Sequence, residues 1–169
     1  MRPVKGVDVL LRSLRLLPPE SPIHLLLIGE IRDKKVLHLS KDPEIASRAH
    51  FAGYRSDAPA LINASDAFVM PSIEREGLPR AVFEAMALKK PVIVSDVGGM
   101  PEQVLHNKTG LVIPPSDEKA LADAMTQLAA DPANAAELGN AGYKRLNDNF
   151  HISSTIDAFE ALLHKICQV

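Results

Sequence analysis

Residues 23–29, IHLLLIG, are a continuous apolar run that ends at a glycine. Such runs are typical of strands buried on both faces, as in a parallel sheet, because a half-exposed strand would alternate apolar and polar side chains. Similar short runs recur at residues 66–70, 91–95 and 110–114, with a weaker candidate at 49–53. Segments with helical periodicity lie between them. The sequence therefore predicts an α/β fold, with a Rossmann-like parallel sheet covered by helices on both faces.

The last third of the chain lacks such runs and predicts three successive helices over residues 116–167. Ser116 is the expected N-cap of the first helix, and Pro132, directly after Asp131, the expected first residue of the second. The third helix, residues 151–167, carries an apolar face made of Ile152, Ile156, Phe159, Leu162, Leu163 and Ile166. We expect these helices to form a C-terminal cover.

The length of 169 residues, 46% of them hydrophobic, suits one domain with one substantial core. A strand usually opens a doubly wound sheet, yet residues 1–6, MRPVKG, look like a loop that leads into a helix. We therefore expect residues 1–169 to form a single Rossmann-like domain that lacks its first strand.

Composition argues against several classes of function. The net charge of −2 and the pI of about 6.3 give no basic face for nucleic acid. No apolar run reaches the roughly 18 to 20 residues of a membrane span, and the N-terminus lacks a signal-peptide cleavage pattern. The six histidines form no paired metal-ligand motif, and the single cysteine, Cys167, cannot form an internal disulfide. The sequence predicts a cytoplasmic protein without a metal site.

Residues 71–86, PSIEREGLPRAVFEAM, follow a predicted strand and lead into a predicted helix. Ligands of open parallel sheets bind at this edge, where loops enter helix N-termini. Pro79 fits the first helical position and leaves the N–H groups of Leu78, Arg80 and Ala81 to face an anion. Gly77 allows close approach to the backbone. The segment predicts a phosphate site.

Glu76 and Glu84 flank this site, and the helical side chain of Glu84 leans back toward the loop. Carboxylates would repel a bare phosphate, but they accept hydrogen bonds from vicinal hydroxyls. A ligand with hydroxyls on both sides of its phosphates, such as a nucleotide sugar, fits both the phosphate site and the two flanking carboxylates. Alternatively, Arg80 and Glu84 form an i,i+4 pair and Glu76 complements a helix dipole, each worth about 0.3 to 1 kcal/mol. Spacing alone leaves the two interpretations balanced.

The whole segment of residues 71–117 resembles the signature region of glycosyltransferase family 4, the retaining GT-B enzymes, with their Glu-x7-Glu motif at Glu76 and Glu84. RPVKGVDVLLRSL resembles the phosphate-binding opening of the family, HLLLIG its next strand and loop, and HFAGYRSDAPALINASDAFVMPS the approach to the motif. The resemblance thus covers nearly the whole chain.

The resemblance implies a role for each matched residue. Glu76 would hold the hydroxyls of the transferred sugar and Lys5 would neutralise the diphosphate, so these two are the expected catalytic residues. Glu84 would hold the ribose hydroxyls. The remaining donor-binding residues would be Gly77, Leu78, Arg80, Arg55, close to the nucleobase, and Gly29. For Gly98 and Gly99 a structural role in tight turns is favoured.

The chain departs from the family pattern at three places. A second diphosphate-binding arginine would lie upstream of Met1, the loop after Ile28 has one glycine where many relatives have two, and Pro79 replaces a glycine. The N-terminal domain of a GT-B enzyme, which binds the acceptor, is not part of this sequence. Residues 151–167 resemble the segment that packs on that domain, and self-association through this helix is a further expectation.

The leading hypothesis is the donor-binding half of a glycosyltransferase that passes a sugar from a nucleoside diphosphate sugar to a hydroxyl acceptor, without a cofactor or an obligatory metal. This half alone is expected to be incomplete for catalysis. Polysaccharide or lipopolysaccharide synthesis, in the cytoplasm or at the inner face of the membrane, follows from the resemblance only. The alternatives are a non-catalytic nucleotide-binding or partner-docking module and a nucleotide-sugar epimerase-like fragment.

Overall fold

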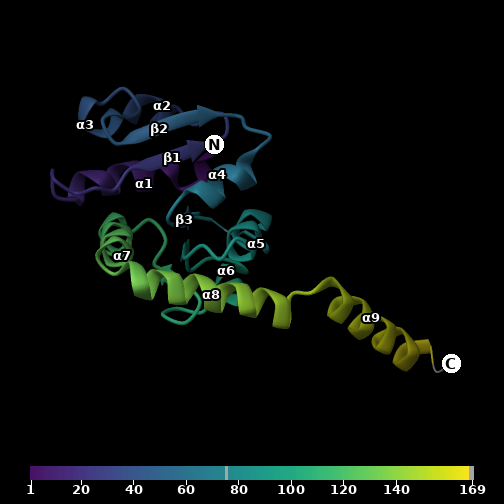
Figure 1. Ribbon diagram of the computed structural model, residues 1–169. Coiled ribbons are helices and arrows are strands. Elements are labelled where there is room, and N and C mark those ends of the chain that lie inside the picture. The colour runs from purple at the N-terminus through teal and green to yellow at the C-terminus, as the bar shows by residue number, and fades with distance from the viewer. Residues whose placement is uncertain (75, 168–169) are drawn as a thin grey trace.

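The computed structural model describes residues 1–74 and 76–167 and has the alternating α/β organisation that the sequence predicts (Figure 1). The elements in chain order are η1 (Pro3–Lys5), α1 (Val7–Ser13), η2 (Leu14–Leu16), β1 (Leu25–Ile28), α2 (Lys34–Leu39), α3 (Pro43–Ala46), β2 (Ala49–Gly53), α4 (Ala58–Ala64), β3 (Phe68–Met70), α5 (Arg80–Ala87), β4 (Val92–Ser95), α6 (Met100–Gln103), β5 (Leu111–Ile113), α7 (Glu118–Ala130), α8 (Pro132–Asn149) and α9 (Ile152–Cys167). The expected strands are all present, including the weaker candidate that became β2.

The strands are parallel, and they form two hydrogen-bonded groups. β1 pairs with β2, with Leu25 opposite Ala49. β4 lies between β3 and β5, with Ile93 opposite Leu111. Within residues 1–74 and 76–167 no strand pairing joins the two groups. The parallel α/β architecture is confirmed, but its sheet is divided between β1 and β3.

The side chains of β4 point alternately into two buried clusters, which explains why the strand is apolar throughout. Ile93 packs into a core with α1, β1, α2, α3 and α7. Its neighbours Val92 and Val94 point to the opposite face, into a second cluster with α5 and α6. All four residues of β4 are buried. A strand covered by helices on both faces cannot show the period-two alternation of a half-exposed strand.

The helical cover begins as expected, except for its first cap. The N-cap of α7 is Asp117, whose carboxylate accepts from the Ala120 N–H, whereas Ser116 lies one residue earlier with φ of 60°. The prediction of Ser116 was wrong because a left-handed residue cannot provide the extended N-cap geometry. Asp131 caps α8, and Pro132 is its first residue, as predicted.

Helix α9 extends away from the rest of the domain (Figure 1). The apolar residues expected on its face are exposed: Ile152, Ile156, Phe159, Leu162, Leu163 and Ile166. Among the helices that the structure describes, none combines the length and apolarity needed to cross a membrane.

Candidate functional site

The loops that follow the strands carry several of the predicted site residues. Gly29 follows β1, Arg55 lies just beyond β2, and Glu76 lies beyond β3, while the structural glycine Gly98 lies beyond β4. The carboxyl ends of parallel strands open on one edge of an α/β layer, which is where such folds bind ligands. The fold therefore assembles at one edge residues that are far apart in the sequence.

Lys5 and Glu76 form a close ion pair. The Lys5 Nζ lies 2.7 Å from the Glu76 Oε1, with exposed side-chain fractions of 27% and 17%. The backbone brings them together, because the N–H of Ile73 donates to the carbonyl of Val4 at 2.9 Å. Gly6, with φ of 61°, allows this approach, since a Cβ there would lie 1.9 Å from the Pro71 carbonyl oxygen.

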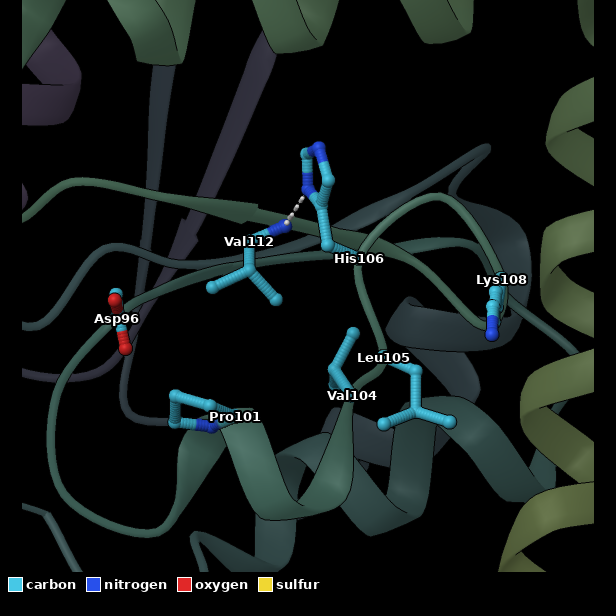
Figure 2. Close-up of a pocket in the computed structure, with 7 residues that line it drawn as sticks. All are labelled: Asp96, Pro101, Val104, Leu105, His106, Lys108 and Val112. Carbon is cyan, nitrogen blue, oxygen red and sulfur yellow. Dashed lines mark hydrogen bonds between the residues drawn. The ribbon is translucent and has the colours of Figure 1, made fainter.

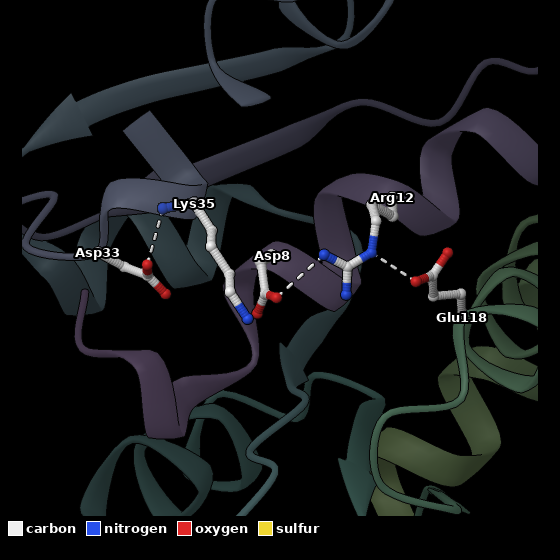
Figure 3. A network of polar contacts seen from close by, with 5 residues as sticks. All are labelled: Asp8, Arg12, Asp33, Lys35 and Glu118. Carbon is white, nitrogen blue, oxygen red and sulfur yellow. Dashed lines mark hydrogen bonds and ion pairs between the residues drawn. The ribbon is translucent and has the colours of Figure 1, made fainter. Parts of the chain in front are cut away.

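The position of α1, and with it of Lys5, is fixed from the other end of that helix. Arg12 joins Asp8 on its own helix to Glu118 at the start of α7 (Figure 3). Partial burial disfavours the charge of Arg12, but the hydrogen bonds to Glu118 and Asp8 outweigh this effect and raise its pKa. The polar network therefore secures α1 against α7.

A buried hydroxyl also holds Glu76. The Ser72 Oγ donates to the Glu76 Oε1 at 3.3 Å, and Ser72 has no exposed surface. Ser72 was not among the predicted site residues. The only signal in the sequence was a small hydroxyl four residues before Glu76, which is too common to single out.

The backbone of Glu76 rests on the Gly98–Gly99 turn. The Gly99 N–H donates to the Glu76 carbonyl at 3.0 Å. Gly98 has φ of 57°, and a Cβ there would lie 1.9 Å from the same carbonyl oxygen. The structural role favoured for these glycines has a concrete form, because they let one loop lie directly against the next.

The start of α5 lies one residue later than predicted. Pro79 is the N-cap, with ψ of 122°, and the helix begins at Arg80. Pro79 has the extended backbone of an N-cap, so the prediction that it is the first helical residue was wrong by one position. The N–H groups of Arg80 and Ala81 still have no acceptor within the helix. A Cβ on Gly77 would meet no atom within 4 Å, so the backbone there is open to a ligand.

Glu84 makes only a loose contact. The Arg80 Nη2 lies 3.9 Å from the Glu84 Oε1, and the side chains are 92% and 38% exposed. The i,i+4 pair that the alternative interpretation required is therefore present but weak, since exposed ion pairs contribute about 0 to 1 kcal/mol. The carboxylate of Glu84 remains accessible at the surface.

Arg55 and Gly29 complete the predicted set. Arg55 donates to both carboxylate oxygens of Asp57, at 2.8 and 2.7 Å, and this pairing raises the pKa of Arg55 and lowers that of Asp57. The Gly29 N–H donates to the Gly53 carbonyl at 2.6 Å. Gly29 has φ of 119°, and a Cβ there would meet no atom within 4 Å, which leaves its backbone approachable.

Two hollows of the surface lie elsewhere. One, of about 330 Å³, is lined by Asp96, Pro101, Val104, Leu105, His106, Lys108 and Val112 (Figure 2). The other, of about 380 Å³, is lined by Arg12, Lys34, Lys35, His38 and Leu39. Neither hollow includes Glu76 or Glu84.

We found no group of three or more His, Cys, Asp or Glu side chains arranged to hold a metal ion in residues 1–74 and 76–167.

Comparison with known proteins relates the chain to glycosyltransferases in each case. Residues 1–145 match the family model of glycosyl transferases group 1. The chain is 29% identical to the capsular polysaccharide biosynthesis glycosyltransferase CapM of Staphylococcus aureus, over 86% of this chain and 39% of the relative. It is 34% identical to a GDP-mannose-dependent α-(1-6)-phosphatidylinositol monomannoside mannosyltransferase of Mycolicibacterium smegmatis, over 88% and 41%.

Solved structures share the fold. The crystal structure of Anabaena HepE in complex with UDP and glucose superposes with a TM-score of 0.83 at 25% identity, over 96% of this chain and 45% of that chain. The chain thus spans less than half of the length of each of these relatives.

Proposed function

The chain belongs to the family of glycosyl transferases group 1, and we propose that it forms the donor-binding half of a retaining GT-B enzyme of glycosyltransferase family 4. The complete enzyme transfers a sugar from a nucleoside diphosphate sugar to a hydroxyl acceptor. Two relatives with named activities support this proposal, since one acts in capsular polysaccharide biosynthesis and the other is a GDP-mannose-dependent mannosyltransferase.

The observation that carries the proposal is the contact between Lys5 and Glu76 beside the open backbone of Gly77. A cation and a carboxylate lie together where a helix begins, so one ligand can meet both a positive and a hydrogen-bond-accepting group. Inorganic phosphate would contact only the cation. A diphosphate joined to a sugar would contact the cation through its phosphates and the carboxylate through its hydroxyls, which favours a sugar nucleotide over a simple anion.

Each residue then has a role in the proposed complex. Lys5 and the N-terminus of α5 neutralise the diphosphate and stabilise the charge that develops on the leaving group. Glu76 accepts hydrogen bonds from hydroxyls of the transferred sugar, and Ser72 keeps its carboxylate in place. The ion pair with Lys5 orients Glu76 before the donor arrives, and Lys5 then meets the diphosphate.

The nucleoside lies at the other side of the diphosphate in this arrangement. Glu84 accepts from the ribose hydroxyls, which its exposed carboxylate can reach without breaking a strong contact. The backbone of Leu78, Arg80 and Gly29 lines the phosphates, and the loop of Arg55 lies near the nucleobase. The proposal requires no metal or other cofactor from this chain.

The acceptor side is proposed to come from an N-terminal domain, onto which the exposed face of α9 packs. Residues 1–169 would then be a single nucleotide-sugar-binding domain. Light scattering tests the role of α9: because its apolar face is exposed in this chain, we expect residues 1–169 to self-associate and residues 1–150 to be monomeric. A monomer in both cases would argue against self-association through α9. Polysaccharide synthesis, a cytoplasmic location and a peripheral position at the inner face of the membrane stay predictions.

Calorimetric titration with UDP, GDP and their sugars tests the donor-binding function. We expect one of the two nucleoside diphosphates to bind, and its monophosphate to bind more weakly because it loses contacts with Lys5 and the start of α5. Absence of binding by all of these ligands, in a sample with native circular dichroism, would contradict the proposal.

A further inference from the structure

The short helix α6 ends with a glutamine, Gln103, that has no exposed surface. Its side-chain Nε2 donates to the Pro79 carbonyl at 3.2 Å, directly before α5 begins. Because a carbonyl oxygen can only accept, this contact fixes which end of the amide faces Pro79. Within residues 1–74 and 76–167, the buried Oε1 of Gln103 has no hydrogen-bond partner. The amide therefore has a partner for its nitrogen and none for its oxygen.

A buried oxygen without a partner lowers the stability of the fold. It gives up its hydrogen bonds to water on folding and gains none from the protein. An apolar side chain of the same length would avoid this cost. The neighbours of Gln103 along the chain favour such a side chain, since Met100 and Val104 both belong to a buried apolar cluster. Packing alone therefore does not account for glutamine at this position, whereas the contact with Pro79 does.

The Pro79 carbonyl lies at the start of the helix that carries the proposed diphosphate site. It also accepts from the Val82 N–H at 3.1 Å, so one donor from α5 and one from α6 hold it. The peptide plane of this carbonyl includes the N–H of Arg80, and fixing one group of a planar peptide fixes the direction of the other. The Arg80 N–H has no acceptor within the helix. Gln103 therefore sets the direction of an N–H group that is available to a ligand.

The turn before α6 holds the other end of the same loop. The Gly99 N–H donates to the Glu76 carbonyl at 3.0 Å. The loop also lies close to this turn, because a Cβ on Gly99 would be only 2.7 Å from the Gly77 carbonyl oxygen. Gly99 and Gln103 thus contact the two ends of residues 76–79, and α6 with its preceding turn supports the whole loop.

Helix α6 is itself anchored to α8, which lies beside it in Figure 1, by Arg145. The Arg145 Nε donates to the Gln103 carbonyl at 3.0 Å, and the Nη2 donates to the Glu102 carbonyl at 2.7 Å. Carbonyls at the end of a helix have no donor within it, and a planar guanidinium can bind two of them in a fixed direction. The helix that carries Gln103 is therefore held in place by the C-terminal cover.

We propose that Gln103 is a positioning residue for the diphosphate and acts through the peptide group between Pro79 and Arg80. The inference rests on the proposed donor-binding function, and Gln103 itself does not contact the ligand. An N–H group that is already oriented binds an anion more tightly, because less conformational freedom is lost on binding. Gln103 therefore strengthens binding of a nucleoside diphosphate, and not of the monophosphate, which lacks the contacts with the start of α5.

Gln103→Met tests the proposal, because methionine keeps the length of the side chain and removes both polar atoms. Gln127→Met is the matched control, since Gln127 lies exposed on α7. In calorimetry, Gln103→Met should bind the nucleoside diphosphate about fivefold more weakly and the monophosphate like the wild-type chain, an effect of about one hydrogen bond. The control should bind both ligands like the wild-type chain. The urea midpoint of Gln103→Met should equal that of the wild-type chain or exceed it.

Amide hydrogen exchange measured by NMR gives a readout that needs no ligand. The Val82 amide should exchange about fivefold faster in Gln103→Met, while the Ile93 amide in β4 does not exchange faster. Arg145→Lys is a second variant, since lysine keeps the charge but lacks the planar fork that spans two carbonyls. It should reduce the preference for the diphosphate in the same direction.

A lower urea midpoint, with both ligands weakened alike, would show that Gln103 is only a structural residue and would overturn the proposal. Unchanged exchange at Val82 would also overturn it, because the start of α5 would then be held without Gln103. An unchanged preference for the diphosphate in Gln103→Met would refute this inference alone. Absence of binding by the wild-type chain would refute the proposed function as well.

Discussion

Glu76 and Glu84 belong to one short motif but lie in very different surroundings. Glu76 is held by Lys5 at 2.7 Å and by the hydroxyl of Ser72, and its backbone rests on the turn at Gly98. Glu84 has only Arg80 at 3.9 Å and a more exposed side chain. The same chemical group is therefore fixed by the fold at one position and left to the solvent at the other.

The two carboxylates therefore differ in how far they are preorganised before a ligand binds. A side chain that the fold already orients loses little conformational entropy on binding, and its neighbours restrict which ligand groups it can contact. A group on an exposed helix face must be ordered by the ligand itself. Changes around Glu76 should accordingly affect both folding and binding, whereas changes at Glu84 should affect binding alone.

The largest effect is expected from Gly98→Ala. Its Cβ would collide with the Glu76 carbonyl oxygen at 1.9 Å, and the left-handed backbone adds strain, so we expect a loss of about 2 kcal/mol or more of unfolding free energy. Urea denaturation measures it. Gly53→Ala is the matched control, because Gly53 has φ of 67° but open space around its Cβ position. Equal losses for the two variants would show that the contact with Glu76 is unimportant.

A smaller effect is expected from breaking the contact between Lys5 and Glu76. Lys5→Met leaves a largely buried carboxylate without its cation, and we expect about 1 to 2 kcal/mol of destabilisation. A double-mutant cycle with Glu76→Gln should give a coupling energy of about 1 kcal/mol in urea denaturation. Additive effects of the two substitutions would mean that the pair does not hold Glu76 in place.

The smallest effect on stability is expected from Ser72→Ala. The lost hydrogen bond is long, at 3.3 Å, so unfolding free energy should fall by about 0.5 to 1 kcal/mol. Because the Ser72 hydroxyl donates to the carboxylate of Glu76, binding of a sugar nucleotide should weaken while binding of the bare nucleoside diphosphate stays unchanged. Calorimetry with both ligands measures this, and equal weakening would place Ser72 outside the sugar side of the site.

The strands were predictable because each is a short apolar run. A strand that is buried on both faces must carry apolar side chains at nearly every position, as all four buried residues of β4 show. The ends of helices were less predictable. Ser116 and Pro79 were each placed wrongly by one residue, since caps depend on local φ and ψ values that residue types only bias. The division of the strands into two groups does not follow from the apolar runs, which indicate where each strand lies but not which strands pair.

The contacts of the site were predictable to a smaller extent. Spacing placed Glu76 and Glu84 near one helix start, but no spacing rule relates Lys5 to Glu76, which are far apart in the sequence. The family resemblance suggested both residues, and their contact depends on the packing of Gly6 against Pro71. Ser72 and the fit of Gly98 against Glu76 are consequences of tertiary packing that the sequence does not display.

The most direct test compares Glu76→Ala with Glu84→Ala in calorimetric titrations with a nucleoside diphosphate and its sugar, using Arg80→Ala as a control that keeps the backbone N–H. Glu84→Ala should weaken both ligands by about tenfold or more, a change of about 1.4 kcal/mol. Glu76→Ala should bind the diphosphate like the wild-type chain but lose its preference for the sugar nucleotide. Unchanged diphosphate binding by Glu84→Ala, or equal weakening of both ligands by Glu76→Ala, would contradict the assignment of the two glutamates.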